Sequence, residues 1–309
     1  MTTDQPTPAD RTAGEPAAPK TPQPLGTAGT RRAAHAPGGG AAPAAEPVLE
    51  IADLTVDFRL DTATVHAVRG VGLRLAQGET LAVVGESGSG KTATALSVLR
   101  LNPQPPCVYA GGRILFEGRD LLTVPEKELG RIRGQDIAMV FQDPMTSLDP
   151  LRRVGAQVAE GLRHHQGLSR AEAGAAALEA LDEVGIPDPE RRFRQYPHEL
   201  SGGLRQRVMI AAALVGRPRV LIADEPTTAL DVTVQRQILD LLVTLQERHG
   251  MAVLLITHDL GVVAETADRV AVMHRGEVVE TGDVLDVFDH PADDYTRQLL
   301  AATPRLELA

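Results

Sequence analysis

Hydrophobic residues begin to follow a regular pattern at about residue 48, where short apolar runs start to alternate with helix-like segments. The first run is interrupted between Ile51 and Leu54, which predicts a strand with an irregularity. Residues 80–84 are almost continuously apolar, as in a strand that is buried on both faces. Up to residue 143 we expect one helix, at 90–101, and strands at 49–58, 65–75, 80–84, 113–116 and 137–141.

From about residue 144 to residue 200 the pattern becomes helical. Ser169 and Glu172 form a capping-box pair ahead of an Ala- and Leu-rich helix that extends to about Val184. Strands that alternate with helices then return, which predicts an α/β fold with a mostly parallel sheet core. An antiparallel β subdomain precedes this core, and an α-helical subdomain at about 143–203 is inserted into it. The later strands are expected at 220–223, 253–256, 270–273 and 277–280, with a helix face formed by Ile238, Leu241, Leu242 and Leu245.

Composition adds limits to this picture. Residues 1–46 are rich in Pro, Ala, Thr and Gly without apolar periodicity, which predicts a disordered tail. The 309-residue chain has a formal net charge of −10, which argues weakly against nucleic acid as its main partner. No apolar run approaches the ~20 residues of a membrane helix, and the tail lacks the apolar core of a secretory signal. We therefore expect a cytosolic chain that reaches a membrane only through partners.

A glycine-rich loop follows the strand at 80–84. Its sequence, Gly85-Glu86-Ser87-Gly88-Ser89-Gly90-Lys91-Thr92, is the G-x-x-x-x-G-K-[ST] phosphate loop between a strand and a helix. The glycines leave backbone N–H groups free to surround phosphate oxygens. Lys91 supplies a charge for the β- and γ-phosphates of ATP, and the Thr92 hydroxyl is a suitable Mg²⁺ ligand. The alternative is a Gly- and Ser-rich turn with an incidental lysine, which the strand–turn–helix context disfavours.

Two carboxylates end the apolar strand at 220–223. In phosphate-loop proteins an Asp at this position holds Mg²⁺, usually through water, and this is the expected role of Asp224. Glu225 is expected to polarise the attacking water. A strand that merely ends at the solvent would also explain the pair, but the phosphate loop in the same chain favours the catalytic interpretation.

A second glycine-rich turn opens a helix that runs to about Val215. Ser201 is a good N-cap, and Gly202 and Gly203 leave backbone N–H groups open at the positive end of that helix. This predicts a second anion-binding helix start, unless the helix is merely an ordinary capped one. Because one ATP does not need two such starts from one chain, a partner chain is expected to supply the complementary half.

Together these motifs resemble the ATPase subunit of ATP-binding cassette (ABC) transporters, over roughly residues 48–300. The resemblance implies the ABC ATPase fold: a phosphate-loop NTPase core of the RecA-like type at 47–283 and a short C-terminal extension at 284–309. Segments at 141–150, 199–211, 223–235 and 256–265 resemble the oligopeptide, dipeptide and nickel importer ATPases. The motifs that occur in the family's order are the phosphate loop, Gln142, Leu200-Ser201-Gly202-Gly203, Asp224-Glu225, Asp231 and His258.

The resemblance also implies a role for each residue. ATP binding falls to the whole phosphate loop, to Thr94 and to Phe58, whose ring either stacks on adenine or belongs to the core. The catalytic residues are Glu225 as base, His258 against the γ-phosphate, Lys91 and Gln142. Thr92, Gln142 and Asp224 are the implied Mg²⁺ ligands. In the dimer, Ser201, Gly202 and Gly203 reach the nucleotide of the facing subunit, and Asp231 lies at the interface.

The implied function is ATP hydrolysis that drives uptake of peptides or a similar small solute. Implied partners are a second ATPase subunit, identical or homologous, two membrane permease subunits and, indirectly, an extracellular solute-binding protein, with this chain peripheral on the cytoplasmic face of the membrane. Alternatives are a non-transport ABC ATPase, a chain that only binds ATP, and import of nickel or another solute. The C-terminal Tyr295 resembles part of the subfamily's extension, but residues 292–294 separate it from His290-Pro291, so docking of the tail stays open.

Overall fold

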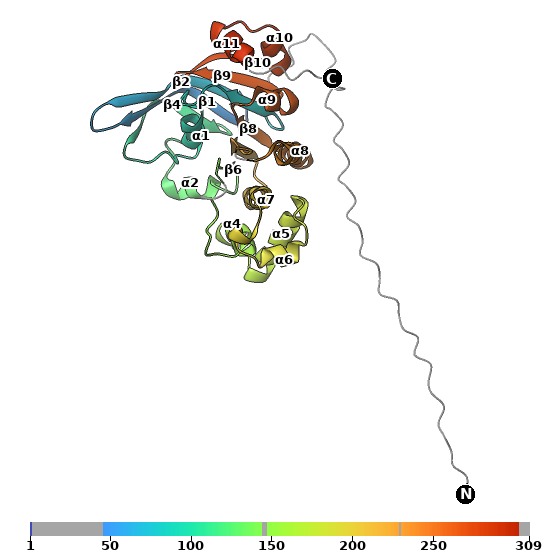
Figure 1. Cartoon of the computed structure of the whole chain (residues 1–309). Coiled ribbons are helices and arrows are strands. Elements are labelled where there is room, and N and C mark those ends of the chain that lie inside the picture. The colour runs from blue at the N-terminus through green and yellow to red at the C-terminus, as the bar shows by residue number, and fades with distance from the viewer. Residues whose placement is uncertain (2–45, 144–146, 229, 303–309) are drawn as a thin grey trace. The chain divides into compact units, whose positions relative to one another are not determined.

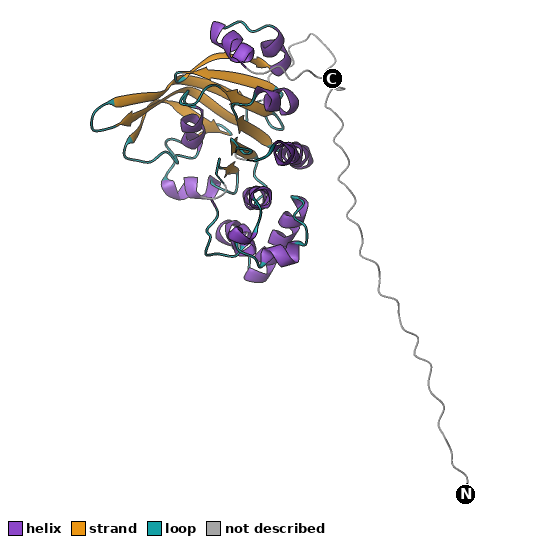
Figure 2. Cartoon of the chain, viewed as in Figure 1, coloured by secondary structure: helices purple, strands orange, loops and turns teal. Residues whose placement is uncertain are grey.

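The computed structural model describes residue 1 and residues 46–143, 147–228 and 230–302. The tail predicted to be disordered therefore lies almost entirely outside the described residues, as does Ala229 beside Asp231. From residue 46 onward, the described chain forms two β-sheets with helices around them (Figures 1 and 2).

The first sheet is antiparallel, in strand order β2-β1-β4-β5. Its strands are β1 (Leu49–Arg59), β2 (Thr64–Leu75), β4 (Cys107–Phe116) and β5 (Arg119–Asp120). The pairing of β1 with β2 shifts register between Ile51 and Leu54, where Asp53 has a positive φ of 51°. The irregularity predicted from the sequence is confirmed. β4 begins six residues earlier than predicted, because Gly111 and Gly112 interrupt its apolar pattern, whereas its pairing with β1 continues on both sides of them with shifts of register.

The second sheet has six strands in the order β10-β9-β3-β8-β7-β6. All neighbours are parallel except the hairpin of β9 and β10, so the mostly parallel core is confirmed. Because the carboxyl ends of parallel strands meet at one edge, the loops that follow them lie together. The strands are β3 (Thr80–Val84), β6 (Ile137–Val140), β7 (Val220–Asp224), β8 (Ala252–Ile256), β9 (Arg269–His274) and β10 (Glu277–Asp283).

Helices connect and cover these strands. Ser169 and Glu172 exchange the two hydrogen bonds of a capping box at the start of α5, as predicted. α1 ends at Val98 rather than at 101, because Arg100 takes a positive φ of 48° that no right-handed helix contains. The helices are α1 (Lys91–Val98), α2 (Glu126–Ile132), α4 (Val154–His165), α5 (Arg170–Glu183), α6 (Pro189–Phe193), α7 (Gly202–Leu214), α8 (Val232–His249), α9 (Leu260–Thr266), α10 (Val284–Asp289) and α11 (Asp294–Ala302), with a 3₁₀ turn, η1 (Pro197–Glu199).

The six-stranded sheet is buried on both faces. On β3, Leu81 and Val83 face a core shared with the first sheet, α1 and α2, whereas Ala82 and Val84 pack with α9, α10 and α11. On β6, β7 and β8, the face opposite the first sheet packs against α7 and α8, and this core continues into α4 and α5. In Figure 1, α4, α5 and α6 lie beyond α7, on the side away from the sheets. Double-sided burial explains the continuous apolar runs seen in the sequence.

Candidate functional site

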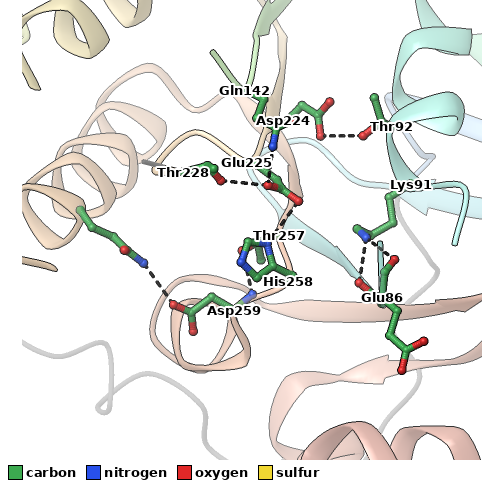
Figure 3. Close-up of polar contacts among 12 residues, drawn as sticks. Glu86, Lys91, Thr92, Gln142, Asp224, Glu225, Thr228, Thr257, His258 and Asp259 are labelled. Atoms are coloured by element: carbon green, nitrogen blue, oxygen red, sulfur yellow. Dashed lines mark hydrogen bonds and ion pairs between the residues drawn. The ribbon is translucent and has the colours of Figure 1, made fainter. Parts of the chain in front are cut away.

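The phosphate loop, Gln142, the Asp224-Glu225 pair and His258 meet at the carboxyl edge of the parallel sheet (Figure 3). The phosphate loop follows β3, Gln142 follows β6, Glu225 follows β7 and His258 follows β8. Residues separated by more than 130 positions are thereby brought within hydrogen-bonding distance, as Thr92 and Asp224 are.

The backbone of the phosphate loop is held against two strands, with no room for side chains at two positions. Gly85 has a φ of 149°, and a Cβ there would lie 2.1 Å from the Met273 carbonyl oxygen. Gly90 has a φ of 103°, and its Cβ would lie 2.4 Å from the Ala67 carbonyl oxygen. Only glycine tolerates both the conformation and the approach. The buried Thr94 hydroxyl donates to the Gly90 carbonyl at 2.9 Å, so Thr94 supports the loop from behind.

Lys91 lies across this loop and is only 6% exposed. Its Nζ donates to the carbonyl oxygens of Gly85 at 2.7 Å and Glu86 at 2.9 Å. An ammonium group has three N–H donors, so one is left for a phosphate oxygen. Burial lowers the pKa of Lys91, while the nearby Glu225 and Asp224 carboxylates act in the opposite direction.

Asp224 and Thr92 bring two oxygens together behind the loop. The Thr92 hydroxyl donates to Asp224 Oδ1 at 3.3 Å, and Asp224 is only 3% exposed. Burial raises the pKa of Asp224 to about 6, although the Thr92 hydrogen bond and the Lys91 charge oppose the rise. A buried carboxylate whose ionised form is destabilised, beside a hydroxyl, is a donor set that suits Mg²⁺. These two residues therefore fit the metal that the sequence predicts.

The Glu225 side chain is held by three other residues. Gln142 Nε2 and Thr228 Oγ1 each donate to Glu225 Oε2 at 2.9 Å. His258 Nδ1 lies 3.2 Å from Oε1, and because an ionised carboxylate only accepts, Nδ1 is the donor in this contact. Glu225 itself has a positive φ of 46°, and its N–H donates to the Ile256 carbonyl on β8 at 2.8 Å. The arrangement fixes a carboxylate beside the phosphate loop, where a general base is needed.

Several supporting residues were not singled out from the sequence. Thr228 is one, and Asp259 is another: its carboxylate caps α9 by accepting from the Gly261 N–H at 2.9 Å and also accepts from Gln235 Nε2 at 3.1 Å. Gln206 is 1% exposed on α7, and its Nε2 donates to the carbonyl of Pro226, one residue after Glu225. Each of these residues is next to a motif, but its partner is known only once the chain folds.

The second glycine-rich turn lies against the start of α8. The Ser201 hydroxyl accepts from the Leu204 N–H at 3.4 Å and so caps its own helix, α7. A Cβ on Gly203 would lie 2.7 Å from Val234 Cγ1, and Asp231 caps α8 through the Val234 N–H at 3.0 Å. Among the described residues, no hydrogen bond or ion pair joins Ser201, Gly202 or Gly203 to the phosphate loop.

Phe58 lies near the end of β1, in register with Val65 on β2 and Cys107 on β4. Its side chain is half-buried and packs against the core between the two sheets. This contact supports the core interpretation of Phe58, and stacking on adenine stays a prediction.

The chain is similar to known proteins over most of the part that the structure describes. The family model described as ABC transporter matches residues 68–228. The peptidoglycan transport ATP-binding protein YejF of Agrobacterium fabrum is 56% identical over 262 residues, which are 85% of this chain and 48% of that protein, so the chain spans about half the length of this relative. The oligopeptide transport ATP-binding protein OppD of Bacillus subtilis is 54% identical over 260 residues, 84% of this chain and 73% of that protein.

The fold is similar to that of solved structures as well. A dimeric structure of a post-hydrolysis state of the ATP-binding cassette MJ0796, bound to ADP and Pi, superposes with a TM-score of 0.68 at 29% identity, and the match covers 76% of this chain and 98% of that one. None of the described helices has the length and apolar character needed to cross a membrane. The motifs, their geometry and these similarities lead to one conclusion: the chain belongs to the ABC transporter family.

Proposed function

We propose that this chain is the ATP-hydrolysing subunit of an ABC importer that takes up peptides or a chemically similar small solute. The observation that carries the proposal is the Glu225 carboxylate, held by Gln142, Thr228 and His258 next to Lys91. A carboxylate fixed beside the phosphate-binding lysine is what a general base for ATP hydrolysis needs, and this supports the proposal. The solute class is supported by the relatives, one of which is named for oligopeptide transport and another for peptidoglycan transport. These names also favour transport over a non-transport role.

Each residue has a defined part in the reaction. The phosphate-loop N–H groups and the remaining N–H of Lys91 bind the β- and γ-phosphates. Thr92 and Asp224 would hold Mg²⁺, with Gln142 as the further ligand expected from the sequence, and the ion neutralises phosphate charge when it is bound. Glu225 accepts a proton from the attacking water on a carboxylate oxygen, while Gln142 and His258 keep that carboxylate in place.

The second glycine-rich turn, at Ser201, Gly202 and Gly203, is the feature that supports a partner subunit. Ser201, Gly202 and Gly203 present a helix start of the kind that binds anions, and among the described residues it makes no hydrogen bond or ion pair with the loop of the same chain. In a dimer of ATPase subunits, identical or homologous, this start faces the nucleotide of the other subunit, and Asp231 lies at the interface. The relative named MJ0796 is described as dimeric. Two permease subunits and, indirectly, a solute-binding protein complete the importer, with this chain peripheral on the cytoplasmic face of the membrane.

The test compares two lysine variants in membrane vesicles that carry the complete importer. Lys91→Ala should abolish ATP-dependent uptake of labelled di- and oligopeptides, because it removes the charge that meets the phosphates. Lys127→Ala, at an exposed position on α2, is the matched control and should leave uptake at the wild-type level. Uptake that persists in Lys91→Ala, or a chain that hydrolyses ATP but never co-purifies with permeases, would overturn the proposal.

A further inference from the structure

The last described helix, α11, is anchored to the body of the protein. Its Tyr295, Leu299 and Leu300 pack against the core beneath β3 and β9. The turn that precedes it is held by Glu280 on β10, whose carboxylate accepts from the Ala292 N–H at 2.8 Å and the Asp293 N–H at 3.1 Å. Residues 292–294, which left docking of the tail open at the sequence level, therefore form part of the attachment.

Tyr295 makes two specific contacts at the start of α11. Its ring stacks on His274 at the end of β9, with 3.9 Å between ring centroids and an interplanar angle of 6°. Its hydroxyl oxygen accepts from the backbone N–H of Glu86 at 3.1 Å. Burial raises the pKa of Tyr295 above its ordinary value, so the hydroxyl stays neutral near pH 7. The C-terminal segment thus reaches the second residue of the phosphate loop.

The same peptide group also contacts Lys91. The N–H of Glu86 and the carbonyl of Gly85 belong to one planar unit, and that carbonyl accepts from Lys91 Nζ at 2.7 Å. The peptide is therefore held by Lys91 on one side and by Tyr295 on the other. A hydrogen bond at one end of a peptide polarises the other end, so the Tyr295 contact both orients this carbonyl and makes it a better acceptor for the ammonium group.

We propose that Tyr295 is a positioning residue of the ATP site, acting through the Gly85–Glu86 peptide to hold Lys91 in the place where it meets the phosphates. The C-terminal helix is thereby part of the nucleotide site rather than a separate appendage. The proposal rests on the use of the phosphate loop for ATP. A purely structural role for Tyr295 is the competing explanation, and it depends on the ring, whereas positioning depends on the hydroxyl.

The test is Tyr295→Phe, which keeps the ring and removes the hydroxyl. Loss of one such hydrogen bond should raise the KM for ATP, and the dissociation constant for ATP measured by calorimetry, roughly two- to tenfold. The kcat and the melting temperature of the nucleotide-free protein should stay near wild type, because the stack on His274 remains. The matched control is Tyr196→Phe, since Tyr196 also stacks on a histidine, His198, but far along the chain from the loop. The control should change neither ATP affinity nor kcat.

A Tyr295→Phe protein that binds ATP as tightly as wild type would overturn the proposal. So would a fall in melting temperature or in kcat without a change in ATP affinity, because the hydroxyl would then serve stability or chemistry and not the loop. Failure of the wild-type protein to bind ATP at all would instead contradict the proposed function, so the two failures are distinguishable.

Discussion

The surroundings of Glu225 and of Ser201 differ in how much of their polar chemistry is met within the chain. The Glu225 carboxylate contacts Gln142 after β6, His258 after β8 and Thr228, which follows it in the same loop after β7. Ser201 donates nothing to another described element; its hydroxyl accepts from its own helix. The carboxylate of the first region is satisfied within the chain, whereas the second region is, in the proposed dimer, a surface that meets the nucleotide of the partner. The difference explains why a single chain holds both motifs.

The largest effect on ATP hydrolysis is expected from a change at Glu225, whose contacts are all made within the chain. In Glu225→Gln the amide is nearly isosteric but does not take a proton from water, so single-turnover hydrolysis should fall ~10²–10⁴-fold. ATP affinity should be kept, because Lys91 and the loop are unchanged. Glu277→Gln, at an exposed position on β10, is the matched control and should hydrolyse ATP normally. Hydrolysis at the parent rate in Glu225→Gln would remove the carboxylate from the mechanism and dissolve the contrast between the two regions.

The second largest effect is expected at Ser201, on dimerisation. Ser201→Arg places a cation where the hydroxyl is expected to meet the partner's nucleotide, so ATP-driven dimerisation, followed by light scattering, should be lost. ATP binding to the isolated subunit should survive. Ser201→Ala is the control, because it removes only the helix cap, at a cost of ~0.5–2 kcal/mol of stability. It therefore separates loss of the cap from the obstruction of dimerisation by the arginine side chain. If the isolated Ser201→Arg subunit loses ATP binding outright, Ser201 serves its own chain's site and the comparison is wrong.

The third effect concerns the buried carboxylate of Asp224, which lies beside Glu225. The folded-state pKa of Asp224 is about 6 against an ordinary value of 3.8, so the contribution of Asp224 to the free energy of unfolding falls as pH rises from about 4 to about 6. Asp224→Asn has no such loss and should be more stable than wild type by about 1–3 kcal/mol at pH 8, without metal or nucleotide, and equally stable below pH 4. Denaturant unfolding at both pH values, with exposed Asp240→Asn as the control, measures this. An equal gain at pH 4 would rule out relief of the buried charge.

The smallest effect is expected from the N-terminal tail. Residues 1–46 have no apolar face with which to contact either region, so their removal should leave the melting temperature and the ATPase rate nearly unchanged. A large loss of either would show that the tail docks on the protein, and its contacts would then have to be considered with those of Glu225 and Ser201.

The sequence predicted the elements that carry strong local signals. The strand–turn–helix around the phosphate-loop motif, the capping box at Ser169 and the strands at 270–273 and 277–280 all depend on neighbouring residues, and each is confirmed. Short helices such as α2 were missed, because seven residues span too few turns to show a periodicity. The start of β4 was missed because two glycines break its pattern.

Long-range contacts are the part that the sequence could not supply. Nothing in the sequence near Thr228 indicates a role for it, whereas in the fold its hydroxyl donates a hydrogen bond to the Glu225 carboxylate. Tyr295 lies more than 200 residues from Glu86, and the residues inserted before it gave reason to doubt that it docks. Such contacts depend on how the sheet is ordered, which local patterns leave undetermined.

The hydrogen bond from Gln206 to the Pro226 carbonyl joins the helix that Ser201 opens to the segment that follows Glu225. Gln206 lies one turn into the helix that Ser201 opens, and Pro226 directly follows Glu225. In the proposed dimer, the first belongs to the partner's ATP and the second to the chain's own. In that dimer, a shift of α7 on binding one ATP would act through this buried amide on the segment that holds Glu225. In thermodynamic terms, the two sites of the proposed dimer would then share a coupling free energy that acts within each subunit.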